Sequence, residues 1–204
     1  MTKIIVGTRN PGKYREILEI MGRLPVEFVS LIDLPEIPEV KEDGTTIEQN
    51  SIKKLRTIFN ATGIPTLADD TGLEVYHLDM EPGVYSARYA GEHASYDENN
   101  MKLLSALRGV NAELRRARFR CVASFTDGII EHTAEGICEG AIVTEPKGTG
   151  GFGYDPLFVP DGFDQTFAEL PTSVRNKISH RAVAFRAMFD FVKAINPTLQ
   201  THIV

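Results

Sequence analysis

The stretch Leu67-Ala68-Asp69-Asp70-Thr71-Gly72-Leu73-Glu74-Val75 places two adjacent acids and a glycine between apolar, β-prone segments. This pattern predicts two strand segments that meet at a tight corner carrying Asp69 and Asp70. Neighbouring carboxylates repel each other, so holding both at the end of a buried strand requires a cation or a shared proton. A solvated surface turn, of the kind that Asp and Gly commonly form, is the alternative. The stretch therefore predicts either a metal-phosphate site or an ordinary turn.

The overall composition is that of a soluble globular protein. The 204 residues are 42% hydrophobic and 25% charged, and a chain of this length can bury a sizeable core. No apolar run approaches the roughly 20 residues of a membrane span, and the first residues follow a strand pattern in place of a secretory signal. Cys121 and Cys138 lie in β-prone runs without metal-ligand spacing, which favours buried free thiols over a disulfide or a ligand pair. We therefore expect a cytoplasmic protein.

The net charge of -6 limits the partners that the chain can bind. Nonspecific binding to nucleic acid depends on neutralising many phosphates with a basic face, so the sequence argues against a nucleic-acid partner. A small polyphosphate needs only a few converging cations. The composition therefore points to a small-molecule partner, with no nucleic acid and no membrane.

A strand-to-helix loop, Thr8-Arg9-Asn10-Pro11-Gly12-Lys13, follows the first β-prone run. Asn10 is a good N-cap and Pro11 fits the first helical position, while Gly12 lets a ligand approach free backbone N–H groups. Lys13 would then lie one turn into an anion site. The loop lacks the glycines and the Lys-Ser/Thr ending of the common phosphate loop, so an ordinary helix start is the alternative.

The remaining pattern predicts a mixed α/β fold. Helical periodicity predicts helices over 45–62 and 97–107, and β patterns predict strands over 26–30, 117–126 and 129–136. The last two strands flank Asp127-Gly128, a strong hairpin signal, so the sheet is expected to be mixed. Residues 81–91 are predicted to form a loop, in which Arg88 is either a phosphate ligand or a structural tether.

Two later segments carry features that favour a ligand. Residues 147–158 are rich in glycine, which suits a loop that closes on a ligand, and Phe152 within it is suited to stack on a nucleobase. A flexible loop whose aromatic residues anchor it to the core is the alternative. Ser179 is a natural N-cap, which puts His180 and Arg181 in the first turn of the last helix, where cations oppose the helix dipole. This placement makes sense if an electron-rich group docks there.

Five motifs in one order over nearly the whole chain resemble the inosine/xanthosine triphosphate pyrophosphatase family: Thr8–Lys13, Ala68–Leu73, Pro82–Arg88, Gly150–Pro156 and Ser179–Arg181. The resemblance implies one domain over residues 1–204. It implies an α/β fold that is elongated and two-lobed around a long mixed β-sheet with flanking helices, with the nucleotide in the cleft between the lobes. It also implies a homodimer and Mg²⁺-dependent hydrolysis of deaminated purine nucleoside triphosphates to the monophosphate and pyrophosphate.

The resemblance also assigns roles to single positions. Asp70 would be the catalytic acid residue, next to Thr71 at the substrate, and Asp70 and Glu42 would bind the metal, with Glu42 preferred to Glu36. The triphosphate would be held by Thr8, Arg9, Asn10, Pro11, Gly12 and Lys13. The base would be held by Phe152, Gly153, Tyr154, Asp155, His180 and Arg181.

One position departs from the family pattern. Arg175 stands where the family usually has a lysine, five residues before the histidine. Arginine can replace lysine as a phosphate ligand, but as a planar fork in place of a point charge. Arg175 is therefore a substrate-binding candidate.

Two other functions compete with this interpretation. A catalytically silent nucleotide-binding or sensing protein on the same fold is the first. The intact Asp69-Asp70 pair favours an enzyme, since a binding protein needs no carboxylate positioned to activate water. The second is a related pyrophosphatase for pyrimidine or modified nucleotides, which the motif Ser179-His180-Arg181 disfavours.

Overall fold

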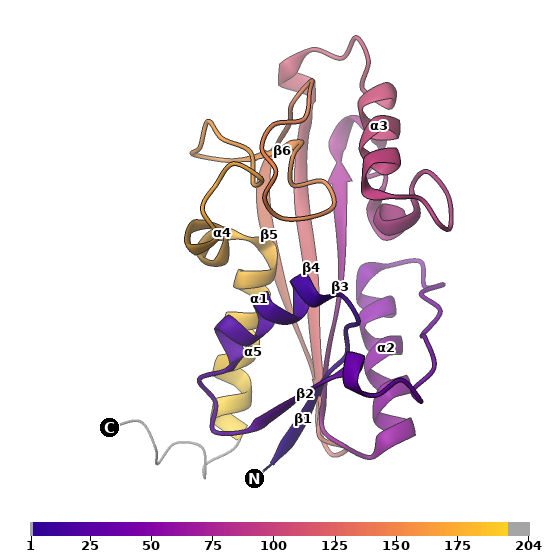
Figure 1. The fold of residues 1–204 in the computed structure, drawn as a ribbon, viewed down its shortest axis with the longest axis vertical. Coiled ribbons are helices and arrows are strands. Elements are labelled where there is room, and N and C mark those ends of the chain that lie inside the picture. Colours follow the sequence, from indigo (N-terminus) through magenta and orange to yellow (C-terminus); the bar gives the residue numbers. More distant parts are fainter. Residues whose placement is uncertain (1, 196–204) are drawn as a thin grey trace. The chain divides into compact units, whose positions relative to one another are not determined.

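A computed structural model describes residues 2–195, and these residues build one mixed sheet with helices around it (Figure 1). The strand order is β2-β1-β3-β4-β5-β6. Parallel pairs join β1 to β2 and to β3, whereas β5 and β6 are antiparallel, so the predicted mixed sheet is confirmed. The strands are β1 Lys3–Val6, β2 Glu27–Ser30, β3 Thr66–Val75, β4 Arg116–Thr126, β5 Glu131–Ile142 and β6 Phe158–Pro160.

The α-helices begin largely where local capping signals predict. Thr46 caps α2 through its side chain and Gly63 ends that helix with a φ of 66°, a left-handed conformation that suits glycine. Ser95 and Glu98 form a capping box at the start of α3. The α-helices are α1 Pro11–Met21, α2 Ile47–Thr62, α3 Tyr96–Ala106, α4 Thr172–Ile178 and α5 His180–Ile195.

The predicted hairpin at Asp127-Gly128 forms, and the strand predicted over 26–30 is β2. The side chain of Asp127 accepts hydrogen bonds from the N–H groups of Ile129 and Ile130, both at 2.9 Å, and Gly128 has a φ of 92°. The predicted loop over 81–91 is different, since residues Gly83–Arg88 within it form the short 3-10 helix η3. No helix in the described range 2–195 is both long enough and apolar enough to cross a membrane.

The chain divides into two compact units. Unit 1 combines Met1–Asp70, Cys121–Gly136 and Arg181–Val204, and unit 2 combines Thr71–Arg120 and Ile137–His180. Strands β3, β4 and β5 each contribute residues to both units.

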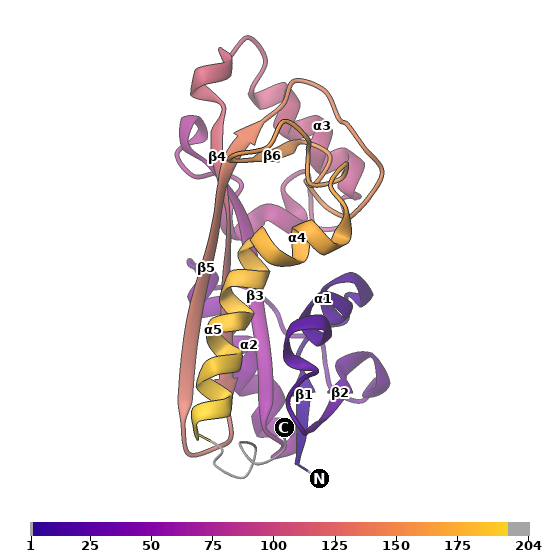
Figure 2. The ribbon, with the colours of Figure 1, turned by 90° about the vertical axis from the view of Figure 1, so that its left-hand side faces the viewer.

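The core of unit 1 forms where α1 and α5 cover the sheet. Phe185 and Met188 of α5 pack with Ile17 of α1 and with Phe125 of β4. Figure 2 shows α5 running along the long strands of the sheet. Cys121 belongs to the same core and carries a reduced thiol, as the sequence predicts.

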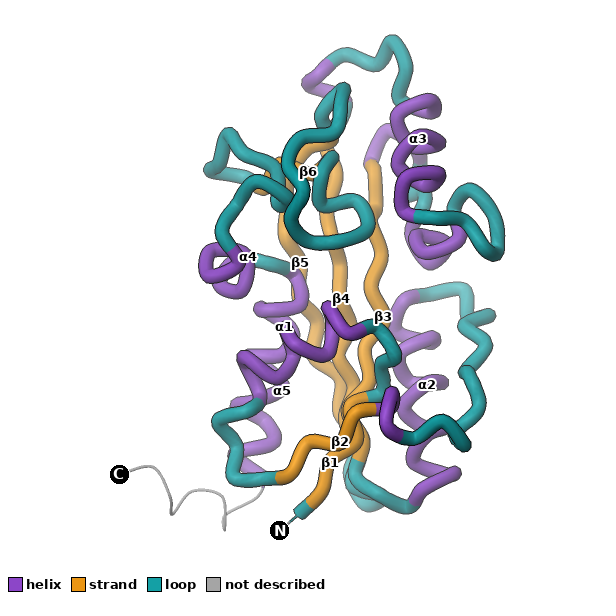
Figure 3. The backbone as a smooth tube through the Cα atoms, in the orientation of Figure 1, coloured by secondary structure: helices purple, strands orange, loops and turns teal. Residues whose placement is uncertain are grey.

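The core of unit 2 forms between α3 and aromatic side chains from β4, β6 and the loops. Figure 3 shows these loops in teal. The ring of Phe119 lies 4.7 Å from that of Phe158 and 6.0 Å from that of Phe167. Leu103 of α3 is fully buried in this core. Cys138 also carries a buried, reduced thiol, and burial raises its pKa to about 12.

Residues 66–75 form one continuous buried strand, so the predicted corner and the alternative surface turn are both wrong. The side chains of Asp69 and Asp70 lie within β3, and the two residues are only 1% and 6% exposed. The strand continues through the acids because cations from other elements offset their charge. Lys54 of α2, for example, donates from Nζ to the backbone oxygen of Asp69 at 2.8 Å.

Candidate active site

The loop before α1 is folded around the Asn10 cap. Asn10 Oδ1 accepts from the N–H groups of Gly12 at 2.8 Å and Lys13 at 3.2 Å, and the Asn10 N–H donates to Thr8 Oγ1 at 3.1 Å. Pro11 at the first helical position has no N–H to offer. The cap therefore uses the N–H groups that the sequence suggested as phosphate ligands, and the loop directs the Lys13 side chain to the acids of β3.

Arg9 fastens the loop to the segment that follows β2. Its guanidinium donates to the backbone oxygens of Leu31 at 3.1 Å, Leu34 at 3.4 Å and Ile37 at 2.5 Å. Three carbonyl acceptors account for much of the donor capacity of a guanidinium. In this structure Arg9 therefore tethers two backbone segments of unit 1.

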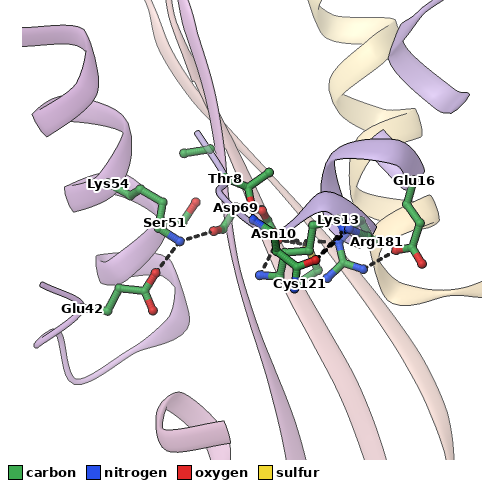
Figure 4. Close-up of polar contacts among 12 residues, drawn as sticks. Thr8, Asn10, Lys13, Glu16, Glu42, Ser51, Lys54, Asp69, Cys121 and Arg181 are labelled. Carbon is green, nitrogen blue, oxygen red and sulfur yellow. Dashed lines mark hydrogen bonds and ion pairs between the residues drawn. The ribbon is translucent and has the colours of Figure 1, made fainter. Parts of the chain in front are cut away.

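A cluster of buried and half-buried charges surrounds Asp69 (Figure 4). Lys13 Nζ lies 3.3 Å and Arg181 Nε lies 3.6 Å from Asp69 Oδ2. Arg181 also donates from Nη1 to Glu16 Oε2 at 2.5 Å. Burial alone would raise the pKa of Asp69, but the neighbouring cations hold it well below its usual range, so Asp69 is a carboxylate at neutral pH.

Lys54 lies on the other side of Asp69 in Figure 4, beside Glu42. Its Nζ forms an ion pair with Glu42 Oε1 and donates to the backbone of Asp69. Burial would lower the pKa of Lys54, but the carboxylates of Glu42, Asp69 and Asp70 raise it above its usual value. A half-buried lysine is thus kept protonated next to both acids that the sequence assigns to a metal.

The donor set around Lys54 suits a loosely held divalent cation. Within residues 2–195, no group of three or more His, Cys, Asp or Glu side chains is arranged to hold a metal ion. Mg²⁺ is commonly bound by one or two carboxylates together with water and substrate phosphates. Glu42 and Asp70, which both act on Lys54, fit that requirement.

In unit 2, the glycine-rich loop closes on Asp155. Asp155 Oδ2 accepts from the N–H of Phe152 at 3.1 Å. Gly151 has a φ of 75°, and a Cβ there would lie 1.9 Å from Asp155 Oδ2 and 2.9 Å from Arg175 Nη1, so only glycine fits. Tyr154 is buried and donates from its hydroxyl to the backbone oxygen of Ser86 at 2.9 Å. Side chains of the loop thus bond both within it and to Ser86, and Phe152 is half-buried.

His180 and Arg175 lie near the aromatic core of unit 2. The His180 ring stacks on Phe119 at a centroid distance of 4.7 Å and an interplanar angle of 17°. Arg175 is buried and donates from Nη1 to the backbone oxygen of Phe167 at 3.2 Å. Arg88 lies over the ring of Tyr85, 5.3 Å from its centroid.

The structure thus distributes the predicted residues over the two units. Unit 1 brings Lys13, Glu42, Asp70 and Arg181 to the charge cluster, and its loop contributes Thr8–Gly12. Unit 2 contains Thr71, Phe152, Gly153, Tyr154, Asp155, Arg175 and His180.

The sequence interpretation missed Lys54 and Glu16. Lys54 shares the spacing i, i+3, i+4, i+7 with Ser51, Leu55 and Ile58, so a charge falls on the buried stripe of α2. A charged residue in such a stripe requires a partner of opposite charge. This requirement was the signal in the sequence that could have pointed to Lys54. Glu16 lies one turn after Lys13 on α1, a weaker signal.

Comparison with known proteins places the chain in a family. The Ham1 family model matches residues 4–191. The chain belongs to the Ham1 family. A curated relative named dITP/XTP pyrophosphatase, from Geobacter sulfurreducens, is 51% identical over 191 residues, which are 93% of this chain and 96% of that relative. Another of the same name, from Desulforamulus reducens, is 47% identical over 195 residues, which are 95% of this chain and 96% of that relative.

A solved structure of a HAM1 protein from Coxiella burnetii is also similar to this member of the Ham1 family. It has a TM-score of 0.87 at 35% sequence identity, and the match covers 95% of this chain and 100% of that chain. The comparisons confirm the predicted family and the mixed α/β fold.

Proposed function

We propose that the chain hydrolyses deaminated purine nucleoside triphosphates (ITP, dITP and XTP) to the nucleoside monophosphate and pyrophosphate. The observation that carries the proposal is the charge cluster of unit 1, where buried Asp69 and Asp70 lie among cations from three different helices. A buried acid pair with so many cations suits a site for phosphates and a metal better than a structural core. The names of the curated relatives supply the substrate class.

Asp70 is the residue proposed to act on water. It orients or deprotonates the water that attacks the α-phosphorus, where the new P–O bond forms while the bond to the bridging oxygen breaks. The electron pair leaves with pyrophosphate, and the proton of the water passes to Asp70. Lys13 supplies positive charge to the phosphates, and Asp69, 3.3 Å from Lys13 Nζ, fixes the direction of that side chain.

Glu42 and Asp70 are the proposed metal ligands. When bound there, Mg²⁺ supplies charge to the phosphate oxygens as a Lewis acid. Lys54, which contacts Glu42 and is influenced by Asp70, holds a positive charge beside both carboxylates. Its cation also limits their mutual repulsion.

Residues of the glycine-rich loop and of the last helix are proposed to hold the base. Phe152 offers a stacking surface that is indifferent to base identity. Arg181 has only donors, and these match the C6 oxygen and N7 of inosine and xanthosine but oppose the amino group of adenine. His180 supports the same preference as a donor from one ring nitrogen. Arg181 Nη1 bonds to Glu16 in this structure, so a base contact would use its other donors.

The proposal extends to the assembly and the compartment. We expect a homodimer, as the family resemblance implies, and a cytoplasmic enzyme, which the buried reduced thiols of Cys121 and Cys138 support. Size-exclusion chromatography with light scattering tests the first point, and a monomer would contradict it.

Release of pyrophosphate and orthophosphate from a panel of triphosphates with Mg²⁺ tests the function. We expect pyrophosphate, with ITP, dITP and XTP hydrolysed well ahead of ATP and pyrimidine triphosphates. Tight binding of ITP without turnover would instead favour the silent nucleotide-binding protein. Orthophosphate as the first product would contradict attack at the α-phosphorus.

A further inference from the structure

A buried side chain of α3 holds the glycine-rich loop of unit 2. Asn100 is 6% exposed and donates from Nδ2 to the backbone oxygen of Gly153 at 3.1 Å. Four residues earlier on the same helix face, the ring of Tyr96 lies 6.4 Å from that of Phe152. Helix α3 therefore contacts the loop at two consecutive residues.

Apart from its carbonyl, Gly153 offers the neighbouring elements little by which they could hold the loop. Its φ is 63°, and a Cβ built on it would meet no atom within 4 Å. The turn around it is closed internally, since the Asp155 N–H donates to Phe152 O at 3.3 Å and the Phe152 N–H donates to Asp155 Oδ2. These internal bonds keep the shape of the turn, but its position depends on bonds to other elements. The bond from Asn100 is one such bond.

Packing alone does not explain an asparagine at position 100. Leu103 on α3 and Leu107, the C-cap residue of that helix, are buried in the apolar core of unit 2. Asn100 Oδ1 is buried too, and no hydrogen-bond donor among residues 2–195 lies within reach of it. A buried acceptor without a donor costs stability, so an apolar residue would suit the core of α3 at least as well. The bond to Gly153 is the contact that requires an amide.

We propose that Asn100 is a positioning residue for the nucleotide base. It holds the Gly153 carbonyl so that Phe152 and Asp155 keep the geometry in which they meet the base, and so it acts through the loop without touching the substrate. The proposal rests on the assignment of this loop to the base under the proposed function.

The neighbouring Asn99 provides a matched control. It is buried on the same helix, but its side chain donates to Ala87 O at 3.2 Å and accepts from the Ala90 N–H at 2.7 Å. Ala87 lies within η3 and Ala90 shortly after it, so both partners are outside the glycine-rich loop. Substitution of Asn99 should therefore disturb a different segment.

The test compares Asn100→Leu and Asn100→Ala with Asn99→Ala and the unchanged chain. Hydrogen exchange should speed up in peptides covering residues 148–157 for both Asn100 variants, and in peptides covering 86–91 for Asn99→Ala. The KM for ITP should rise about 3- to 10-fold in the Asn100 variants, the effect of one lost hydrogen bond, while kcat stays within about twofold. The Tm of Asn100→Leu should not fall, because that variant also removes the buried acceptor.

Two results would overturn the proposal. One is unchanged exchange over 148–157 in both Asn100 variants, and the other is a lower Tm with KM and kcat unaltered, which would make Asn100 a purely structural residue. If the unchanged chain does not hydrolyse ITP, the proposed function fails by itself. The exchange comparison then decides whether Asn100 positions the loop.

Discussion

Replacement of Asp69 by asparagine should destabilise the protein at neutral pH. The substitution would keep the shape of the side chain but remove the charge that Lys13 and Arg181 approach at 3.3 and 3.6 Å. At an effective dielectric constant of about 20, each of these two pairs contributes roughly 5 kcal/mol. Desolvation of the buried ions cancels several kcal/mol of this sum, so the net loss expected for Asp69→Asn is about 3–5 kcal/mol.

The loss should depend on pH with a definite sign. The pKa of Asp69 is lowered in the folded protein, so its charge stabilises the fold above the pKa of the unfolded chain, near 3.9. That contribution disappears as the pH falls from this value through the lowered folded pKa. The difference in stability between the unchanged chain and Asp69→Asn should therefore be constant near neutral pH and shrink only in strong acid.

Urea unfolding of both proteins from pH 7 downward measures this difference. Asp43→Asn is the matched control, because Asp43 also pairs with a lysine, Lys53, but both side chains are exposed, and exposed ion pairs contribute little. A loss below about 1 kcal/mol for Asp69→Asn at pH 7 would show instead that the cations of the cluster do not need this carboxylate.

Three further substitutions test the proposed roles. Lys13→Ala should raise the KM for ITP and leave the ratio of ITP to ATP hydrolysis unchanged; a shifted ratio in steady-state assays would remove Lys13 from the phosphate end. Arg181→Ala should lose most ITP hydrolysis and narrow that ratio by roughly 10- to 100-fold, the effect of one buried polar mismatch; equal losses on both substrates would make Arg181 a phosphate ligand or a tether. Gly151→Ala should strongly reduce activity, because a Cβ there would overlap Asp155; near-normal kcat/KM would show that the loop can relax.

Local signals predicted the elements of this fold well. Asn10 and Thr46 cap their helices through bonds to N–H groups two or three residues away, and the Asp127-Gly128 turn is equally local. Such interactions can be read from a short window of sequence, because both partners lie within it.

Local sequence signals do not predict the structure where distant partners decide it. β3 continues through Asp69 and Asp70 because Lys13, Lys54 and Arg181 come from three separate helices, which no window around the acids contains. The ion pairs of Lys54 with Glu42 and of Arg181 with Glu16 depend on tertiary contacts in the same way. Motif recognition named several of these residues but could not say which of them touch each other.

The proposed function requires that Asp70 activate the water that attacks a triphosphate bound by the charge cluster of unit 1. Initial rates of pyrophosphate release from ITP with Mg²⁺ test it most directly in Asp70→Asn, whose fold is checked by circular dichroism and urea unfolding. We expect a native-like fold and a kcat lowered by at least ~100-fold, the contribution typical of a general base. A folded Asp70→Asn protein with near-normal kcat would contradict it.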